Sequence, residues 1–249
     1  MTNKAKPIKL IALDMDGTLL MDNHDVSKAN RQAIALAKEK GVDVVICTGR
    51  SLMACQDYAD DLELNSYIVT GNGSEIWHTS GQLIERNLLK SELVNMMWEL
   101  RNEHKTNHWA ASVDKVWKNE MPEDILNYEW LKFGFDTTDN DARDVIFDLL
   151  SKHPELEVSN SSLTNIEINA VGVNKAVAIK KLCSFLNISM DNVLSMGDSL
   201  NDMAMITEAG LGVAMGNAQE IVKESADWIT YSNNEDGVAH AIHKFVLNA

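Results

Sequence analysis

The stretch LIALDMDGT, residues 10–18, decides the fold of this chain of 249 residues. Four apolar residues are followed at once by acidic and small residues, which is typical of a buried strand that ends in a polar turn. Further apolar runs at 42–47, 67–70 and 193–196 also end in polar or glycine residues, and helical patterns separate the runs. This alternation predicts an α/β fold, in which helices cover both faces of a doubly wound parallel sheet.

The alternation weakens between residues 83 and 170, where four of the six tryptophans lie. Here the patterns predict a mixture of helices and strands, with helices at 91–103, 123–133 and 139–152, and strands at 110–117, 155–158 and 165–169. We interpret this stretch as an α+β cap domain inserted into the sheet domain. The core would then comprise residues 1–82 and 171–249, and the cap residues 83–170.

Charge and composition narrow the classes of function. The chain has 37 acidic and 22 basic residues, and its net charge of −15 repels nucleic acids and anionic membrane surfaces. No apolar run is long enough to span a bilayer, and the first residues, Met1–Pro7, are polar. The three cysteines are scattered and odd in number, which favours a reducing compartment. We therefore expect a cytoplasmic protein, monomeric by default, that binds neither nucleic acid nor membrane.

The strand ends of the predicted sheet carry a cluster of carboxylates. Asp14 and Asp16 follow the first strand, and Asp198 and Asp202 follow the strand at 193–196. Ligands bind at the carboxyl ends of parallel strands, so these side chains should meet at one edge of the sheet. Like charges repel one another unless a cation lies between them, and oxygen ligands without sulfur or histidine suit Mg²⁺. A carboxylate beside such an ion can attack a phosphate group.

The same residues resemble the haloacid dehalogenase-like superfamily and, within it, the Cof-type phosphatases of subfamily IIB. The resemblance covers residues 8–82 and 171–249, and it includes the run Ala214–Ala218. It implies a Rossmann-like core, an α+β cap, and hydrolysis of phosphomonoesters through an aspartyl-phosphate. One departure is Ala176 after Lys175, where the family usually has glycine.

The resemblance also assigns roles to single residues. It implies that Asp14 is the nucleophile and a Mg²⁺ ligand, and that Asp16 is the general acid and base and binds the ion through its backbone carbonyl. Asp198 and Asp202 would complete the metal site.

Further residues would bind the phosphate and the substrate. The resemblance implies that Thr48 and Lys175 hold the transferring phosphoryl group, that Asn201 contacts phosphate, and that Asn72 lies on the substrate side. We add Gly49 and Arg50, which directly follow Thr48 in the sequence.

On these grounds we predict a Mg²⁺-dependent phosphatase that hydrolyses small phosphorylated metabolites such as sugar phosphates. Two alternatives use the same residues. One is a phosphotransferase or phosphomutase that passes the phosphoryl group to a sugar hydroxyl, and the other is a phosphoacceptor module without turnover. The choice of substrate would depend on side chains near the cap, for which the candidates are Arg50, His108, Trp109 and Trp117.

Overall fold

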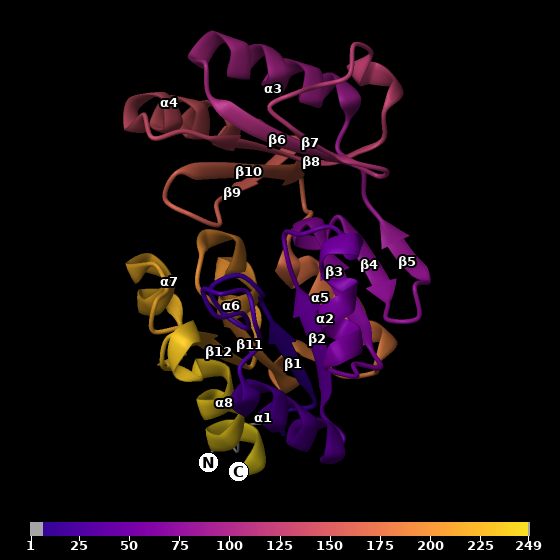
Figure 1. Ribbon diagram of the computed structural model, residues 1–249, viewed down its shortest axis with the longest axis vertical. Helices are drawn as coiled ribbons and strands as arrows, with labels where there is room; N and C mark the ends of the chain where they lie inside the picture. Colours follow the sequence, from indigo (N-terminus) through magenta and orange to yellow (C-terminus); the bar gives the residue numbers. More distant parts are fainter. Residues whose placement is uncertain (1–6, 249) are drawn as a thin grey trace.

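The computed structural model describes residues 7–248 and arranges them around two β-sheets, shown one above the other in Figure 1. The larger sheet has eight strands in the order β13-β12-β11-β1-β2-β3-β4-β5, and the smaller has five in the order β7-β6-β8-β10-β9. The chain enters the smaller sheet after β5 and returns to the larger one with α5. A cap sheet therefore interrupts the core sheet in sequence. Met1–Lys6, most of the polar start considered above, lies outside the described residues.

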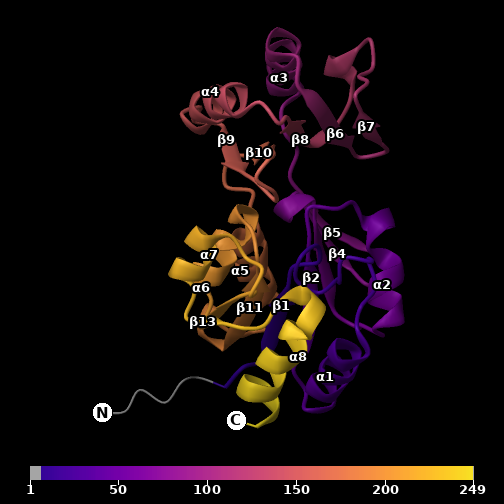
Figure 2. The same cartoon turned by 60° about the vertical axis from the view of Figure 1, so that its left-hand side comes forward.

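The core sheet is mostly parallel, which confirms the expected fold class. β1 pairs in parallel with β2 on one side and with β11 on the other, so the two halves of the core lie side by side beneath the cap (Figure 2). An antiparallel hairpin, β4–β5, forms one edge. The core strands are β1 (Leu10–Leu13), β2 (Asp43–Cys47), β3 (Tyr67–Thr70), β4 (Glu75–His78), β5 (Leu83–Arg86), β11 (Val193–Gly197), β12 (Leu211–Ala214) and β13 (Trp228–Ile229).

Helices cover both faces of the core sheet. Ile11 and Leu13 of β1 pack with α1 and α8 on one face, whereas Leu10 and Ala12 pack with α5 on the other, because successive side chains of a strand point to opposite faces. No helix within residues 7–248 is long and apolar enough to cross a membrane. The core helices and short helical turns are α1 (Lys28–Glu39), η1 (Leu52–Ala54), α2 (Gln56–Asp61), η2 (Gly71–Gly73), α5 (Lys175–Phe185), η4 (Met190–Asn192), η5 (Leu200–Asp202), α6 (Met203–Glu208), α7 (Glu220–Ser225), η6 (Asn233–Glu235), α8 (Gly237–Ile242) and η7 (His243–Leu247).

The cap is an antiparallel sheet with helices on one face only. Its helices α3 and α4 lie on the side away from the core, and the other face of the sheet is turned towards the core (Figure 1). Phe133, Phe135, Ile166 and Ile168 point to the helices and belong to the hydrophobic cluster of the cap. The cap elements are α3 (Ser91–His104), β6 (Asn107–Ser112), β7 (Val116–Lys118), η3 (Ile125–Asn127), β8 (Trp130–Asp136), α4 (Asn140–Ser151), β9 (Leu156–Ser159) and β10 (Asn165–Ala170).

Two predictions for the cap are wrong. The helix predicted at 123–133 is instead the short turn η3 followed by the strand β8. β8 lies between β6 and β10 and pairs with both, so hydrogen bonds that only the tertiary fold supplies outweigh the helical spacing of its apolar residues. The single strand predicted at 110–117 is two strands, β6 and β7, because the chain turns back at 113–115.

The exact boundary between core and cap stays a prediction, and strand pairing favours a small shift. β5, at residues 83–86, falls in the range expected for the cap but pairs with β4 in the core sheet. We therefore propose that the first boundary lies at 87–90, in the segment that leads from β5 to α3.

Candidate active site

The ends of three neighbouring strands bring predicted site residues to one edge of the core sheet. Asp14 follows β1, and its backbone N–H donates to the carbonyl of Met196 in β11 (3.0 Å). Thr48 follows β2 and donates in the same way to Val69 in β3 (2.8 Å). Asp198 follows β11. The first two bonds continue the parallel ladders by one residue, which keeps the strand ends in register.

Three carboxylates form a buried acidic cluster at this edge, Asp14, Asp198 and Asp202, in which one oxygen of each lies within 4.8 Å of the others. Lys175, fully buried at the start of α5, donates to Asp14 (2.6 Å) and to Asp202 (2.7 Å). One lysine faces three carboxylates, so the acidic cluster keeps an excess of negative charge. A divalent cation would neutralise that excess.

The pKa values of these groups reflect the same imbalance. Burial and the neighbouring Asp202 raise the pKa of Asp14 well above its ordinary value, although Lys175 opposes the shift. Burial and Asp202 also raise the pKa of Asp198, to about 7. Burial alone would lower the pKa of Lys175, but Asp14 and Asp202 outweigh it and raise that pKa. The lysine therefore stays charged, whereas Asp14 and Asp198 bind protons more readily than usual.

Local hydrogen bonds hold the two aspartates that follow β11. Gly17 has a φ of 82°, and a Cβ there would lie 2.6 Å from a carboxylate oxygen of Asp198, so glycine permits both the turn and the close approach. Thr18 (3.3 Å) and Ser199 (2.9 Å) donate their hydroxyls to Asp198. Asp202 accepts the backbone N–H groups of Asp198 (2.9 Å) and Ser199 (3.1 Å), and so caps the turn η5.

Asp16 lies outside the acidic cluster, on its accessible side. Arg50 donates to both oxygens of Asp16, through Nε at 2.8 Å and Nη2 at 2.5 Å. The Asp16 side chain is nevertheless 51% exposed, so a ligand can still reach it. Arg50 was expected among the substrate-binding residues, and the structure places it in a bidentate pair that fixes the direction of the Asp16 carboxylate.

A buried polar network joins the core to the cap beside the acidic cluster. Asn201 donates to Asn72 (3.3 Å), and Asn72 donates in turn to Glu167 of β10. Glu167 pairs with Lys132 of β8 (3.1 Å), and Lys132 also donates to the backbone carbonyl of Gly49 (3.3 Å). The network therefore connects three predicted substrate-site residues of the core to two charged residues of the cap.

Lys132 and Glu167 are site residues that were not predicted from the sequence. Burial alone would raise the pKa of Glu167, but Lys132 and a hydrogen bond from Asn72 outweigh it and lower that pKa. A signal was present, because polar and apolar residues alternate in both β8 and β10, as they do in a strand with one polar face. The pattern identifies the face, whereas the pairing of Lys132 with Glu167 depends on the order of the strands.

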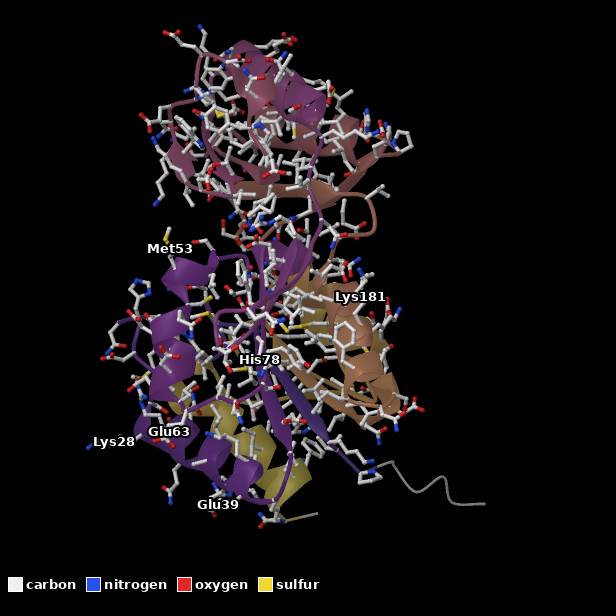
Figure 3. The ribbon with its side chains drawn as sticks, turned by 90° about the vertical axis from the view of Figure 1, so that its right-hand side faces the viewer. Lys28, Glu39, Met53, Glu63, His78 and Lys181 are labelled. Atoms are coloured by element: carbon white, nitrogen blue, oxygen red, sulfur yellow. The ribbon has the colours of Figure 1, made fainter. Side chains whose placement is uncertain are left out.

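A cavity of about 730 Å³ lies between the core and the cap. On one side of it, η1 lies at the cap-facing edge of the core, where its Met53 side chain is 79% exposed (Figure 3). Asp14 and Asp198 of the acidic cluster line the core side of the cavity, and the cap covers its opposite side. The core residues that line the cavity are Asp14, Asp16, Gly49, Arg50, Ser51, Ala54, Asp198, Ser199 and Asn201, and the cap lines it with residues of β6, β7, β8 and β10.

The structure brings most of the predicted site residues together around this cavity. Thr48 is buried next to Gly49 and Arg50, which line the cavity, and its hydroxyl accepts the backbone N–H of Arg50 (3.1 Å). Of the specificity candidates, Arg50, His108 and Trp109 line the cavity, but the buried His108 ring stacks on Phe133, on the helix side of the cap sheet. Trp117 is not among the described residues that line it and packs against the hydrophobic cluster of the cap instead, so it does not face a ligand in the cavity.

Known proteins resemble this chain over nearly its whole length. A profile of haloacid dehalogenase-like hydrolases matches residues 11–129 and 118–242. The chain is 59% identical over 240 residues, 96% of each chain, to the 5-amino-6-(5-phospho-D-ribitylamino)uracil phosphatase YcsE of Bacillus subtilis. A solved haloacid dehalogenase-like hydrolase from Bacteroides thetaiotaomicron is 29% identical with a TM-score of 0.80, and 95% of this chain and 99% of that chain are covered.

A second solved structure, a haloacid dehalogenase-like hydrolase from B. subtilis, has a TM-score of 0.89 at 24% identity, with 96% of this chain and 100% of that chain covered. At that identity the likeness concerns the fold alone. Together with the profile and the relative at 59% identity, it confirms the resemblance noted in the sequence. The chain therefore belongs to the haloacid dehalogenase-like hydrolases, and it is a phosphoric monoester hydrolase.

Proposed function

We propose that this phosphatase hydrolyses 5-amino-6-(5-phospho-D-ribitylamino)uracil, a ribityl phosphate that carries a uracil ring, and that it requires Mg²⁺. The observation that carries the substrate is the 59% identity, over 96% of both chains, to a Bacillus subtilis phosphatase of that name. The cavity supports it, because charged residues of the core line one side of the cavity and Trp109 of the cap lines the other. The sugar phosphates expected from the sequence would place their phosphate beside the acidic cluster in the same way, but they have no aromatic ring that could contact the cap.

The acidic cluster fits Mg²⁺. It offers only carboxylate oxygens, and the raised pKa values of Asp14 and Asp198 support a cation between them. Asp14 and Asp198 line the cavity, whereas Asp202 is fully buried and is held by Lys175 and by backbone N–H groups. We therefore assign direct binding to Asp14 and Asp198 and the orientation of Asp198 to Asp202. The family resemblance adds the backbone carbonyl of Asp16. When bound, the ion neutralises the repulsion between the nucleophile and the phosphate.

In the first step, the Asp14 carboxylate attacks phosphorus, the bond to the ribityl oxygen breaks, and Asp16 gives a proton to that oxygen. Lys175 lies 2.6 Å from Asp14 and supplies positive charge beside the nucleophile. Thr48 and Asn201 bind the phosphoryl oxygens in this scheme. The first step leaves an aspartyl-phosphate at residue 14 and releases the ribitylaminouracil.

In the second step, water attacks the phosphorus of the aspartyl-phosphate and Asp16 takes up the proton of that water. The bond between phosphorus and the Asp14 oxygen breaks, so inorganic phosphate leaves and both aspartates return to their first state. Arg50 keeps Asp16 directed at the reacting atoms through its two hydrogen bonds. The cap excludes bulk water from the cavity during the reaction.

The proposed function predicts a preference that a panel of phosphate esters can measure. With Mg²⁺ present, we expect kcat/KM for 5-amino-6-(5-phospho-D-ribitylamino)uracil to exceed that for hexose 6-phosphates by about tenfold or more, because only the former fills the cap side of the cavity. Released inorganic phosphate is the readout. EDTA should abolish the release and added Mg²⁺ restore it. Transfer of the phosphoryl group to a sugar hydroxyl, without free phosphate, would identify a phosphotransferase instead.

Magnesium should stabilise the protein more at pH 8 than at pH 5. The pKa of Asp198 is about 7 in the folded protein against an ordinary value of 3.8, so the folded state binds the additional proton. The metal-free protein therefore loses stability as the pH rises from about 4 to 7, and below that window Asp198 is protonated in both states. A cation competes with this proton and binds best once the proton has left.

Thermal unfolding in EDTA and in Mg²⁺ tests this pH dependence. At pH 8 and a Mg²⁺ concentration of about 100 times Kd, we expect the Tm to rise by about 5–10 °C, and at pH 5 by much less. The control is Asp198→Asn, which cannot titrate and should remove most of the metal effect at both pH values. An equal rise in Tm at pH 5 and pH 8 in the unmodified protein would count against binding at Asp198.

A further inference from the structure

The face of the cap sheet that lines the cavity is built from alternate residues of neighbouring strands. In β6 these are Asn107, Trp109 and Ala111, and Trp109 is paired in the sheet with Gly134 of β8. Paired residues of antiparallel strands point to the same face. Asp136, two residues beyond Gly134, lines the same cavity.

Gly134 serves to seat the indole ring of Trp109. A Cβ on Gly134 would lie 2.3 Å from ring carbons of Trp109, so the ring lies directly over the glycine backbone and no other residue leaves it room. The φ angle of Gly134 is not in the left-handed region, and β8 is regular here, so the backbone conformation itself does not call for glycine. The glycine is therefore explained by the position of the tryptophan, which is half-buried and lines the cavity.

Asp136 is the one acidic residue lining the cavity whose carboxylate makes no hydrogen bond or ion pair with any part of residues 7–248. The other carboxylates there have partners: Asp16 is paired with Arg50, Glu167 with Lys132, and Asp14 with Lys175, while Asp198 accepts two hydroxyl groups. A partly exposed carboxylate beside an aromatic side chain can accept N–H groups from a ligand.

We infer that Trp109, seated on Gly134, and Asp136 form the binding site for the heterocyclic ring at the leaving-group end of the substrate. The inference rests on the proposed function and adds which residues select the ring. An indole face stacks on a planar heterocycle, and a carboxylate accepts the ring and amino N–H groups that an aminouracil offers. The phosphate of the same molecule then reaches the acidic cluster on the opposite side of the cavity, with the ribityl chain between the two ends.

Two substrates separate ring binding from phosphate transfer. 5-Amino-6-(5-phospho-D-ribitylamino)uracil has the ring, and D-ribitol 5-phosphate has the same phosphorylated chain without it. We expect Trp109→Leu to lower the ratio of their kcat/KM values by about 10- to 100-fold, chiefly through KM for the ring-bearing substrate. Gly134→Ala keeps the tryptophan but displaces its ring, and it should lower the same ratio. Asp136→Leu should lower it by about tenfold.

Trp117→Leu is the matched control, because it removes an indole of the same size from the neighbouring strand β7 on the opposite face of the cap sheet. It should leave the ratio unchanged. If the unmodified enzyme prefers the ring-bearing substrate and Trp109→Leu and Asp136→Leu both keep that preference, the ring site is wrong while the proposed function holds. If the unmodified enzyme shows no preference for the ring-bearing substrate over D-ribitol 5-phosphate, the proposed substrate and the ring site are both wrong.

Discussion

Asp14→Asn is expected to lower kcat by about 10⁴-fold or more, because an amide oxygen does not form the aspartyl-phosphate on which both steps depend. The fold should persist. Burial raises the pKa of Asp14, which means that the folded protein disfavours its charge, and Lys175 keeps its second partner, Asp202. In EDTA at neutral pH we therefore expect the variant to unfold at the same temperature as the unmodified protein or at a higher one.

Trapping the phosphoenzyme tests the role of Asp14 directly. Substrate labelled with ³²P and an acid quench should leave label on the unmodified protein, hydroxylamine should remove it, and Asp14→Asn should carry none. Asp57→Asn changes an exposed aspartate of α2 in the same way and should keep both the label and the activity. Substantial Mg²⁺-dependent turnover by Asp14→Asn would overturn the assignment of the nucleophile.

Lys175→Met is expected to lower the free energy of unfolding by about 3–5 kcal/mol in EDTA, because it leaves Asp14 and Asp202 buried without their cation. The methionine fills a similar volume, so lost packing contributes little. Activity should fall as well, since the positive charge 2.6 Å from the nucleophile is gone. Added Mg²⁺ should recover part of the stability and little of the activity.

Urea unfolding with and without Mg²⁺ measures both parts of this effect. Lys180→Met is the control: Lys180 lies on the same helix, and its side chain and that of its partner Glu208 are 50% and 40% exposed. This change should alter the free energy of unfolding by about 1 kcal/mol or less. If Lys175→Met unfolded within 1 kcal/mol of the unmodified protein in EDTA, the buried ion pairs would not hold the acidic cluster together.

The core sheet and the acidic cluster at its edge could be predicted because each strand and the functional residue that follows it are adjacent in sequence. Functional residues directly follow the apolar runs that form parallel strands, and the carboxyl ends of such strands meet at one edge of the sheet. The sequence therefore predicts that Asp14 and Asp198 lie close together. The sequence also predicts Asn72 and Asn201 as site residues. Their direct contact required the turn at η2, where Asn72 adopts a φ of 61°.

The cap side of the site was not predictable in the same way. β8 contains Trp130, Phe133 and Phe135, whose spacing suits a helix as well as a strand, and only pairing with β6 and β10 decides between them. Lys132 finds Glu167 across that pairing, 35 residues away in sequence. The hydrogen bond between Arg50 and Asp16 likewise joins residues that follow two different strands, so no local sequence pattern predicts it.

The central position of β1, between β2 and β11, has a consequence for biosynthesis. Ile11 pairs with Leu194 in the complete sheet, although the two residues are far apart in sequence. A nascent chain that has emerged from the ribosome only as far as the cap therefore contains Asp14 but not yet Lys175, Asp198 or Asp202. The strands of the cap sheet pair with one another, so the cap can fold before the residues that complete the core have been synthesised. The acidic cluster can therefore assemble only after residues 175–202 have been synthesised and β11 has paired with β1.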